Sequence, residues 1–389
     1  MQGNTPNDTA NFHLSPAGND ANPCTYAAPC KTIARAVTLM QGGDTLLVHG
    51  GTYDEGEIWI RGNFNTSPSA YLVIVAYQNE IPLFNNGVRH VIIDADYVEI
   101  RGLHFTNAKF IAHVGNHTGA RIIGNHFTGG GWPWAVISVE GSSILIADNN
   151  IAIDGNVQGS QGHAIYVHAG RDIEISRNRL SGMSGYGVHV FDQRRTEDPP
   201  GFIRRIVNVQ VLDNTISNSR ERAGIIIAAQ APDAFADSVL IARNVLFDHA
   251  GDGMRVIDQV SHVRIFNNTI FRINTDGSVA TGKDGIYIGI NVNGVEMKNN
   301  LIHLASDATA GHVAVSGATN VTLSSGLYWP SPLRLSNVSD ASPLLLDPMF
   351  VNTSSFDFRL QANSPAIDQG LNVGLPFNGS APDIGAVER

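Results

Sequence analysis

The sequence has few cysteines, few charged residues and no long apolar run. Its 389 residues include two cysteines, and Asp, Glu, Lys and Arg together make up 15% of the chain. No apolar run is long enough to cross a bilayer, so membrane insertion is not expected. Acidic residues outnumber basic ones by 35 to 25, for a net charge of −10. A surface that follows nucleic-acid phosphates needs clustered positive charge, so a nucleic-acid partner is not expected either.

The two cysteines, Cys24 and Cys30, lie close together in a proline-flanked segment. This spacing suits a local disulfide formed in an oxidising compartment, and two unrelated buried thiols are the alternative. No charged-then-apolar signal segment follows Met1. Either a targeting peptide has been removed or the protein is cytoplasmic, and we expect removal, which predicts a secreted or periplasmic protein.

Helical periodicity is almost absent after residue 45. One helix is predicted over residues 31–40, where an apolar stripe precedes two glycines, and it would cover the open end of a stacked core. The rest of the chain consists of short β-branched strands separated by Gly, Asn and Asp turns. These features predict an all-β protein.

An internal repeat runs through the chain from Val98 onwards. Its pattern, apolar-x-apolar-x-x-Asn, ends at Asn149, Asn178, Asn214, Asn244, Asn268 and Asn300, with an incomplete copy at Asn125 and a later one that has Gly326 in the Asn position. The uneven spacing suits coils with fixed strands and loops of variable length. Stacked asparagines give each side-chain amide a neighbour above and below, which predicts a parallel β-helix. A propeller or sandwich would not explain the Asn column.

The Asn column, the Ile/Val-rich coils and the opening FHLSPAGNDANPCTYAAPCKTIARAVTLMQGGDTLLVHGGTYDE resemble the right-handed parallel β-helix proteins of the pectate-lyase-like superfamily. That superfamily includes polysaccharide lyases, uronan epimerases, glycosidases and non-catalytic adhesins, so the resemblance implies the fold more specifically than the chemistry. The last residues are similar to a segment that closes many secreted bacterial β-helix proteins. We therefore expect a flexible N-terminus at 1–12, a capped solenoid at 13–330 and an extension packed on it at 331–389.

The second strand of each coil is expected to carry the functional residues. Its register is set by a small residue: Ala135, Ala164, Gly187, Gly224, Gly253 and Gly285. The next residue points into the core and the one after it points outward. The predicted outward column is Ile137, Tyr166, His189, Ile226, Arg255 and Tyr287. Stacking that only covers the surface, with solvated ion pairs, is the alternative interpretation of these residues.

Tyr287 of this column and further polar residues that flank it are predicted to bind substrate. The flanking residues are His163, Tyr186, Gln193, Arg194, Arg195, Arg220, Arg222, Gln230, Gln259 and Lys283. The planar fork of arginine matches carboxylate and sulfate oxygens. An anionic polysaccharide or oligosaccharide is therefore the expected partner. A network of loop ion pairs is the alternative. The oligomeric state is not predicted.

The column suits proton abstraction beside a uronate carboxylate, followed by β-elimination of the 4-linked sugar in alginate, pectate or a glycosaminoglycan. Arg255 would neutralise the carboxylate, His189 would be the base and Tyr166 would protonate the leaving oxygen. The same groups would serve a uronan C5-epimerase. Asp252 and Asp284, on neighbouring coils, make a glycoside hydrolase the second candidate. A non-catalytic, adhesive glycan-binding surface is the third.

Calcium is a further candidate, because the superfamily's pectate lyases use calcium to neutralise the carboxylate. Asp192 and Asp258 are the residues that would hold it here. Carboxylate oxygens are the ligands that calcium prefers. No acidic cluster in this sequence matches the superfamily's motif, so the sequence does not assign a metal.

Overall fold

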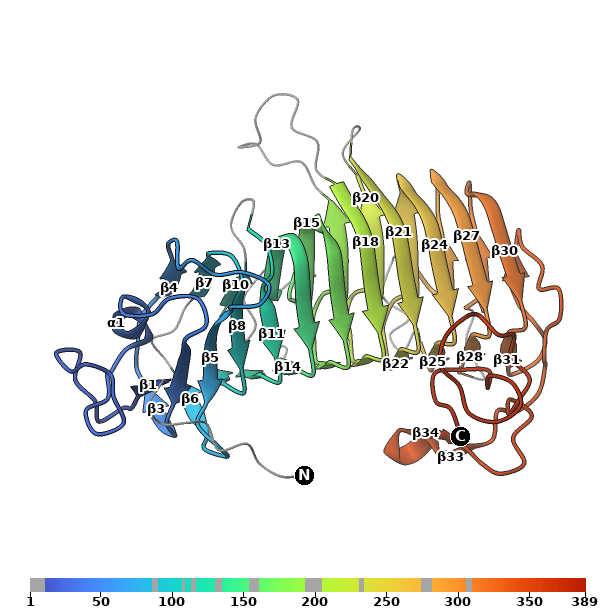
Figure 1. The fold of residues 1–389 in the computed structure, drawn as a ribbon. Coiled ribbons are helices and arrows are strands. Elements are labelled where there is room, and N and C mark those ends of the chain that lie inside the picture. The colour runs from blue at the N-terminus through green and yellow to red at the C-terminus, as the bar shows by residue number, and fades with distance from the viewer. Residues whose placement is uncertain are drawn as a thin grey trace.

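The computed structural model describes residues 11–85, 90–106, 109–112, 117–129, 135–153, 161–192, 205–230, 234–273, 282–305 and 310–389. The chain winds through successive coils whose strands stack in parallel along one axis (Figure 1). The predicted all-β parallel β-helix is therefore confirmed. Each complete coil contributes strands to three stacks, called here faces 1, 2 and 3.

The faces follow one another in the order 1, 2, 3 along each coil. Face 1 contains β4 (Ile58–Arg61), β7 (His90–Asp94), β10 (Lys109–Ala112), the first parts of β13 (Ala135–Ala147) and β15 (His163–Ser176), then β17 (Val188–Asp192), β20 (Ile225–Ala229), β23 (Met254–Asp258), β26 (Ile286–Ile288), β29 (Val313–Val315) and β32 (Leu335–Ser336). Face 2 contains β1 (Asn11–Leu14), β2 (Thr45–Val48), β5 (Leu72–Ala76), β8 (Val98–Arg101), β11 (Arg121–Ile123), the last parts of β13 and β15, then β18 (Arg205–Leu212), β21 (Phe235–Ala242), β24 (Val260–Phe266), β27 (Val292–Lys298) and β30 (Thr319–Ser324). Face 3 contains β3 (Gly51–Tyr53), β6 (Pro82–Phe84), β9 (His104–Thr106), β12 (His126–Gly129), β14 (Asn150–Ile153), β16 (Arg179–Ser181), β19 (Thr215–Ser217), β22 (Val245–Phe247), β25 (Thr269–Phe271), β28 (Leu301–His303) and β31 (Leu327–Trp329).

A ladder of buried asparagines joins the coils at the corner between faces 2 and 3. The backbone N and the Nδ2 of Asn178 donate to Oδ1 of Asn214 at 2.9 and 3.0 Å. Nδ2 of Asn214 donates in turn to Oδ1 of Asn244 at 2.9 Å and to the carbonyl of Ile175 at 2.9 Å. The same amide-to-amide links connect all the predicted positions: Asn125, Asn149, Asn178, Asn214, Asn244, Asn268 and Asn300.

The ladder ends at Gly326, which occupies the Asn position but has no side-chain amide. There the backbone N–H of Gly326 donates to Oδ2 of Asp340 at 2.9 Å, and the hydroxyl of Tyr328 donates to the same oxygen at 2.6 Å. A carboxylate from the following segment therefore takes the place of the next asparagine. This contact joins the C-terminal segment to the last coils.

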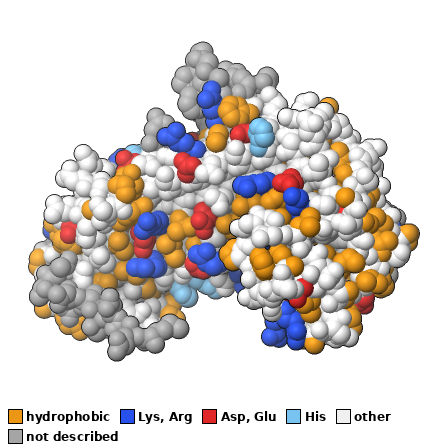
Figure 2. Space-filling model, turned by 45° about the vertical axis from the view of Figure 1, so that its right-hand side comes forward, with side chains coloured by type: hydrophobic (Ala, Val, Ile, Leu, Met, Phe, Trp, Pro, Cys, Tyr) orange, Lys and Arg blue, Asp and Glu red, His pale blue; other side chains and the backbone are white. Residues whose placement is uncertain are grey.

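The residues before the ladder asparagines have positive φ, including Asp148 at 58° and Arg177 at 56°. Two consecutive pairs of these residues form ion pairs across neighbouring coils, with N–O distances of 2.9 Å for Arg177 to Asp148 and 2.6 Å for Arg243 to Asp213. Basic and acidic side chains lie beside one another over the solenoid surface in the same way (Figure 2). Exposed pairs of this kind contribute little net stability.

The small residues that set the register lie at a tight corner between faces 3 and 1. A Cβ atom built on Gly253 would lie 2.7 Å from Cγ2 of Ile270 and 2.6 Å from the carbonyl of Gly285. The Gly285 position is equally close to Ile302, at 2.6 Å. Glycine is required here because the backbone passes directly over core side chains of face 3.

Replacing Gly253 by alanine is expected to lower the free energy of unfolding by about 2 kcal/mol, because the new methyl group overpacks the corner. Gly56→Ala is the matched control, since a Cβ there would meet nothing within 4 Å. Urea unfolding of both variants measures the difference. Equal free energies of unfolding in the two variants would show that the corner accommodates the methyl group without loss of stability.

The predicted helix is present but shorter, as α1 (Ile33–Val37). The hydroxyl of Thr32 caps it by accepting from the Arg35 N–H, and Glu55 accepts from the N–H groups of Ile33 and Ala34 at 2.9 Å each. Its buried residues belong to the solenoid core, as predicted for a cap. No helix in the described parts of the chain is long and apolar enough to cross a membrane.

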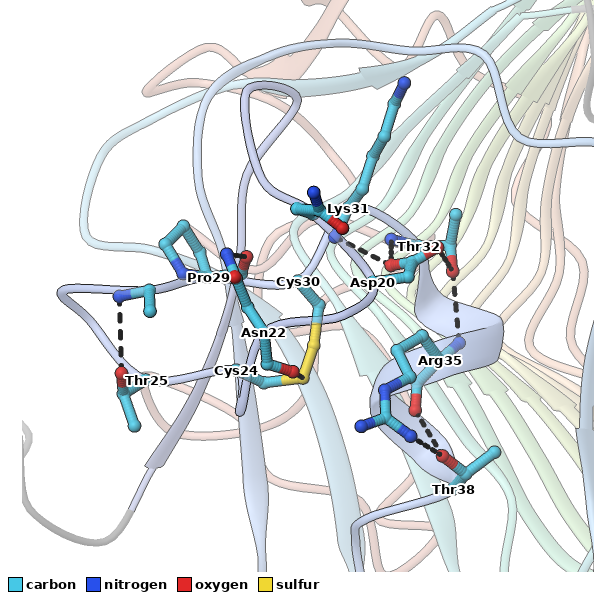
Figure 3. Close-up of a disulfide and its surroundings, with 12 residues drawn as sticks. Asp20, Asn22, Cys24, Thr25, Pro29, Cys30, Lys31, Thr32, Arg35 and Thr38 are labelled. Atoms are coloured by element: carbon cyan, nitrogen blue, oxygen red, sulfur yellow. Dashed lines mark hydrogen bonds between the residues drawn. A yellow bond between two sulfur atoms is a disulfide. The ribbon is translucent and has the colours of Figure 1, made fainter.

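Cys24 and Cys30 form the expected disulfide, with their Cα atoms 4.6 Å apart (Figure 3). Both cysteines are buried in the core cluster that contains the α1 side chains. Beside them, Asp20 accepts from the N–H groups of Lys31 and Thr32 at 2.9 and 3.0 Å. The disulfide loop is thereby fixed to the start of α1.

The segment after the last coil folds back onto face 3. Its antiparallel strands β33 (Phe350–Asn352) and β34 (Asp357–Leu360), joined by a 3-10 turn at Thr353–Ser355, place Phe350 and Phe358 against Phe247 and Phe271. Figure 1 shows this segment beside β25, β28 and β31. At the two ends of the solenoid, β1 begins at Asn11 and pairs with β2, and β32 pairs with β29.

Candidate active site on face 1

The outward column on face 1 has the predicted order over five coils. Tyr166 pairs with His189, His189 with Ile226, Ile226 with Arg255, and Arg255 with Tyr287. The preceding residues, including Ile165 and Val188, belong to the core, which confirms the predicted alternation. Adjacent coils lie about 4.8 Å apart, so Arg255 lies about 10 Å from His189 along the axis.

The prediction for the first coil was wrong by one residue. Tyr166 pairs with Ser138, while Ile137 pairs with Ile165 and is buried in the core. The small residue of each coil predicts that Ala135 lies opposite Ala164, but in the structure Ala135 pairs with His163. The long strand β13 enters face 1 one residue out of phase and has a register irregularity after Val139, which the small-residue pattern does not show.

A stack of aromatic rings surrounds His189. Its ring centroid lies 4.3 Å from that of Tyr166 in a stacked arrangement, and 4.3 Å from that of His163 edge-on. Tyr166 also stacks on His168 at 3.6 Å, and Nε2 of His168 lies 2.7 Å from the Ser138 hydroxyl. The side chains of Tyr166 and His189 are each 7% exposed, so the stack fixes their orientation and removes most of their water.

His168 and Phe191 were missed by the sequence reasoning. They lie two residues after Tyr166 and His189 on the same strands, and the ring centroids of His189 and Phe191 are 4.9 Å apart. The alternation of side chains along a strand places them on the same outward face. Extending the predicted column by two residues would have identified both.

His189 is neutral at ordinary pH. Burial lowers the pKa of His189 well below its usual value, and the nearby histidines and Arg222 lower it further. Its Nδ1 atom is buried without a hydrogen-bond partner among the described residues. A neutral imidazole can accept a proton, which is the state that a general base requires.

His163 was predicted to bind substrate, but it is buried at the corner before face 1. Its Nδ1 accepts from the backbone N–H of Tyr186 at 3.0 Å, and burial lowers the pKa of His163 to about 3. His249 accepts a backbone N–H from Ser219 in the same manner. The hydrogen bond to Tyr186 shows that His163 joins neighbouring coils. Its ring also contacts His189 of the column.

Arg255 is held in place by two neighbours. Its Nη1 lies 2.8 Å from Oδ2 of Asp252, and its guanidinium lies over the Tyr287 ring at 4.3 Å. Tyr186 lies within electrostatic range of both Arg255 and Arg222, each of which opposes the rise in its pKa caused by burial. The structure therefore brings Tyr186 and Arg222 into the neighbourhood of Arg255 at the edge of the column.

Asp252 and Asp284 occupy equivalent corners of neighbouring coils. Oδ1 of Asp252 accepts from the Asp284 N–H at 2.8 Å, and Oδ1 of Asp284 accepts from the Gly311 N–H at 2.9 Å. Asp252 is 1% exposed, and its second oxygen binds Arg255. Burial raises the pKa of Asp252 to about 6 and also raises that of Asp284. Both oxygens of Asp252 are therefore engaged within the protein.

The predicted metal residues, Asp192 and Asp258, end equivalent strands two coils apart, with Ala229 between them. Asp192 is fully buried, and Arg255 is close enough to Asp258 to oppose the rise in its pKa caused by burial. Nowhere in the described ranges do three or more His, Cys, Asp or Glu side chains gather to hold a metal ion. The described residues do not fit a calcium site.

The remaining predicted substrate-binding residues are only partly placed around the column. Gln193, Arg194 and Arg195 lie outside the described residues. Arg220, Lys283 and Gln230 are exposed, and Arg222 is half-buried. Gln259 donates from Nε2 to the carbonyl of Ala229 at 3.4 Å, between the strand ends of β20 and β23.

Comparison with known proteins agrees with the fold described above. The family model described as a right handed beta helix region matches residues 75–231, and one described as a protein of unknown function (DUF1565) matches residues 16–59. The structure of pectate lyase Pel9A is similar over 97% of both chains, with a TM-score of 0.63 and 18% identity. The chain is a right-handed parallel β-helix protein with the pectate-lyase fold. No curated protein matches it in sequence.

Other solved β-helix structures show how widely this fold is used. The structure of an alginate lyase from Paenibacillus sp. str. FPU-7 matches 85% of this chain and 99% of its own, with 12% identity and a TM-score of 0.55. PfbA, a surface adhesin of Streptococcus pneumoniae, matches 79% of it and 84% of its own chain, with 11% identity and a TM-score of 0.52. The fold therefore includes both enzymes and an adhesin, and the choice between them depends on the site.

The ion pair between Arg255 and Asp252 is expected to be lost as the pH drops from 7 to 5, with a midpoint near 6, and an activity that depends on a fixed Arg255 should fall with it. The pKa of Asp252 in the folded chain, about 6, lies above that of a free carboxyl. Protonating it therefore does not destabilise the fold, and the loss is confined to turnover. A pH–rate profile measures the step, which Asp252→Asn should abolish. A step near pH 6 that survives in Asp252→Asn would assign it to another group.

Proposed function

We propose that this protein is a secreted polysaccharide lyase that cleaves a uronic-acid-containing polysaccharide by β-elimination on face 1. The observation that carries the proposal is the column in which Tyr166 stacks on His189 and Arg255 follows two coils further along. The likeness in fold to the structures of a pectate lyase and an alginate lyase supports a carbohydrate-active role. The disulfide between Cys24 and Cys30 supports an oxidising, extracellular location.

Arg255 is the group that would stabilise the charge that develops in the reaction. The proton on the carbon beside a uronate carboxylate is weakly acidic, and its removal spreads negative charge onto that carboxylate. A fixed guanidinium stabilises this charge without reorganising at the moment of reaction. Asp252 and Tyr287 hold Arg255 in place from two sides, so its orientation is set before substrate binds.

His189 would remove the proton and Tyr166 would donate one to the departing sugar oxygen. His189 is neutral and therefore able to accept. A substrate carboxylate bound near Arg255 adds negative charge to the site and raises the pKa of His189 towards its usual range, which strengthens it as a base. Tyr166, in ring contact with His189, is near enough for the two groups to act on neighbouring atoms of one sugar linkage.

The paired-carboxylate alternative has less support from the geometry. A hydrolase needs one carboxyl that protonates the leaving oxygen and another that acts on the sugar or on water. Asp252 is nearly inaccessible, and both of its oxygens are occupied by Arg255 and the Asp284 N–H. We therefore assign Asp252 to positioning Arg255.

The test is ultraviolet absorbance of the unsaturated uronate product, measured with alginate, pectate and glycosaminoglycans, with and without a calcium chelator. A rise on one polymer that survives chelation is expected. Loss of the rise with chelator would move the neutralising role from Arg255 to a metal. New reducing ends without absorbance would contradict the lyase in favour of a hydrolase, altered uronate stereochemistry without cleavage would favour the epimerase, and no change at all would favour a glycan-binding surface.

A further inference from the structure

The outward column of face 1 continues well beyond the proposed site towards the N-terminus. Strand pairing extends it from Tyr166 to Ser138, then to Ile111, Ile92 and finally Trp59 on β4. Trp59 therefore lies four coils from Tyr166 on the same face, or about 19 Å along the axis. None of the three intervening residues carries a charge. Trp59 is the next aromatic residue along this row of paired positions.

Trp59 forms a surface cluster with Arg61, two residues further along β4. Ile58 and Ile60 are fully buried in the core, so Trp59 and Arg61 point outward. The guanidinium of Arg61 lies over the Trp59 ring at 3.9 Å, and its side chain is 57% exposed. The pair therefore presents an aromatic surface and a charged group together to a ligand.

The guanidinium of Arg61 also forms an ion pair with a carboxylate on the neighbouring strand. Nε of Arg61 lies 3.6 Å from Oδ2 of Asp94, which pairs with it across the strands. Oδ1 of Asp94 lies 2.8 Å from Nε2 of His117, whose Nδ1 lies 3.1 Å from Asp96. This network orients Arg61 through Nε, so the guanidinium is pre-organised for a ligand that approaches from solvent.

We propose that Trp59 and Arg61 form a distal sugar-binding subsite for the same uronate polymer. The inference rests on the proposed function, since it takes Tyr166 and His189 as the point of cleavage. A sugar residue of a 1,4-linked chain spans a distance comparable to one coil step, so a chain lying along face 1 places a residue at Trp59 about four sugars from the cleaved bond. Its carboxylate binds the exposed side of the Arg61 guanidinium, and its ring packs against the part of Trp59 that the guanidinium does not cover.

The subsite predicts a dependence on chain length. Oligosaccharides of about three residues bound at Tyr166 are too short to reach Trp59, whereas chains of about eight residues or more reach it. Trp59→Ala is expected to raise KM for long chains about tenfold and to leave kcat, and KM for trimers, unchanged. Arg61→Ala should act in the same direction, and it serves as a second variant if Trp59→Ala does not fold.

The control is Arg101→Ala. Arg101 is 51% exposed and lies 3.4 Å from Glu99, which matches the exposure and pairing of Arg61, but it lies on face 2. The experiment compares KM for long and short chains of the polymer that gives absorbance, using native protein and the three variants. A selective effect of Trp59→Ala and Arg61→Ala on long chains supports the subsite. Equal effects on both lengths, no effect, or the same effect from Arg101→Ala would overturn it while leaving elimination intact.

The subsite is tested separately if no polymer is eliminated. Calorimetric binding of alginate, pectate and a glycosaminoglycan to native protein and to Trp59→Ala then replaces KM. Weaker binding of a long chain to Trp59→Ala, with trimer binding unchanged, supports a sugar site at Trp59 even though the lyase proposal has failed. Unchanged binding of every long chain overturns the subsite as well.

Discussion

His189→Ala is expected to reduce turnover on the uronate polymer by about a thousandfold, with substrate binding changed little. A positioned general base contributes typically 10²–10⁴ in rate, and removing it leaves the α-proton without an acceptor. The ring of His189 lies between Tyr166 and His163, so its loss also releases the orientation of Tyr166. Tyr166→Phe keeps the stacked ring and removes only the hydroxyl, and it should reduce kcat by a comparable factor.

The measurement is kcat and KM from product absorbance, together with calorimetric binding of the polymer. The control is His262→Asn, because His262 is 71% exposed on face 2, pairs with Asp237, and has a positive φ that Asn tolerates. This control should retain native turnover. A native-like kcat in both His189→Ala and Tyr166→Phe would mean that the stack only covers the surface and that other residues carry out the elimination.

Asn214→Ala is expected to lower the free energy of unfolding by about 3 kcal/mol. The substitution removes the oxygen that accepts from the backbone N and the Nδ2 of Asn178, and the amide that donates to Asn244 and to the Ile175 carbonyl. These groups are buried, and each unsatisfied buried donor or acceptor costs about 1–3 kcal/mol. The hydrogen bonds lost to the coils on both sides therefore cost more free energy than rearrangement around the new alanine can recover.

Asn293→Ala is the matched control. Asn293 is exposed on β27 and accepts from the Thr319 hydroxyl at 2.9 Å and from Nδ2 of Asn320 at 2.7 Å. Water replaces these exposed contacts, so its removal should cost well under 1 kcal/mol. Denaturant unfolding of both variants gives the difference, and equal costs would show that the ladder does not hold the coils together.

The fold and the register of the site could both be predicted from the sequence, because both depend on residues at the corners of the coils. In the coils from Asn125 to Asn300, an asparagine fixes the corner between faces 2 and 3. Gly253 and its equivalents fix the corner between faces 3 and 1, where a side chain would meet the core. With both corners fixed, the positions of Tyr166, His189 and Arg255 follow by alternation. The prediction was wrong at β13, where the strand enters face 1 one residue out of phase.

The roles of the corner residues could not be predicted from the sequence. His163 and Asp252 were assigned to substrate binding and to an acid pair because of their residue types. In the structure both are buried and accept backbone N–H groups from the neighbouring coil, and Asp252 also holds Arg255. Such contacts depend on the path of the backbone at a corner, which no residue pattern specifies. His168 was missed although alternation from Tyr166 identifies it.

The measurement that tests elimination most directly is product analysis by mass spectrometry after reaction in water enriched in heavy oxygen. Elimination breaks the linkage without adding water, so the account predicts unsaturated ends and no heavy oxygen incorporated during cleavage. Short incubations limit slow exchange at the reducing end, and product incubated without enzyme corrects for it. Saturated ends with heavy oxygen incorporated at the rate of cleavage would contradict the account and establish hydrolysis instead.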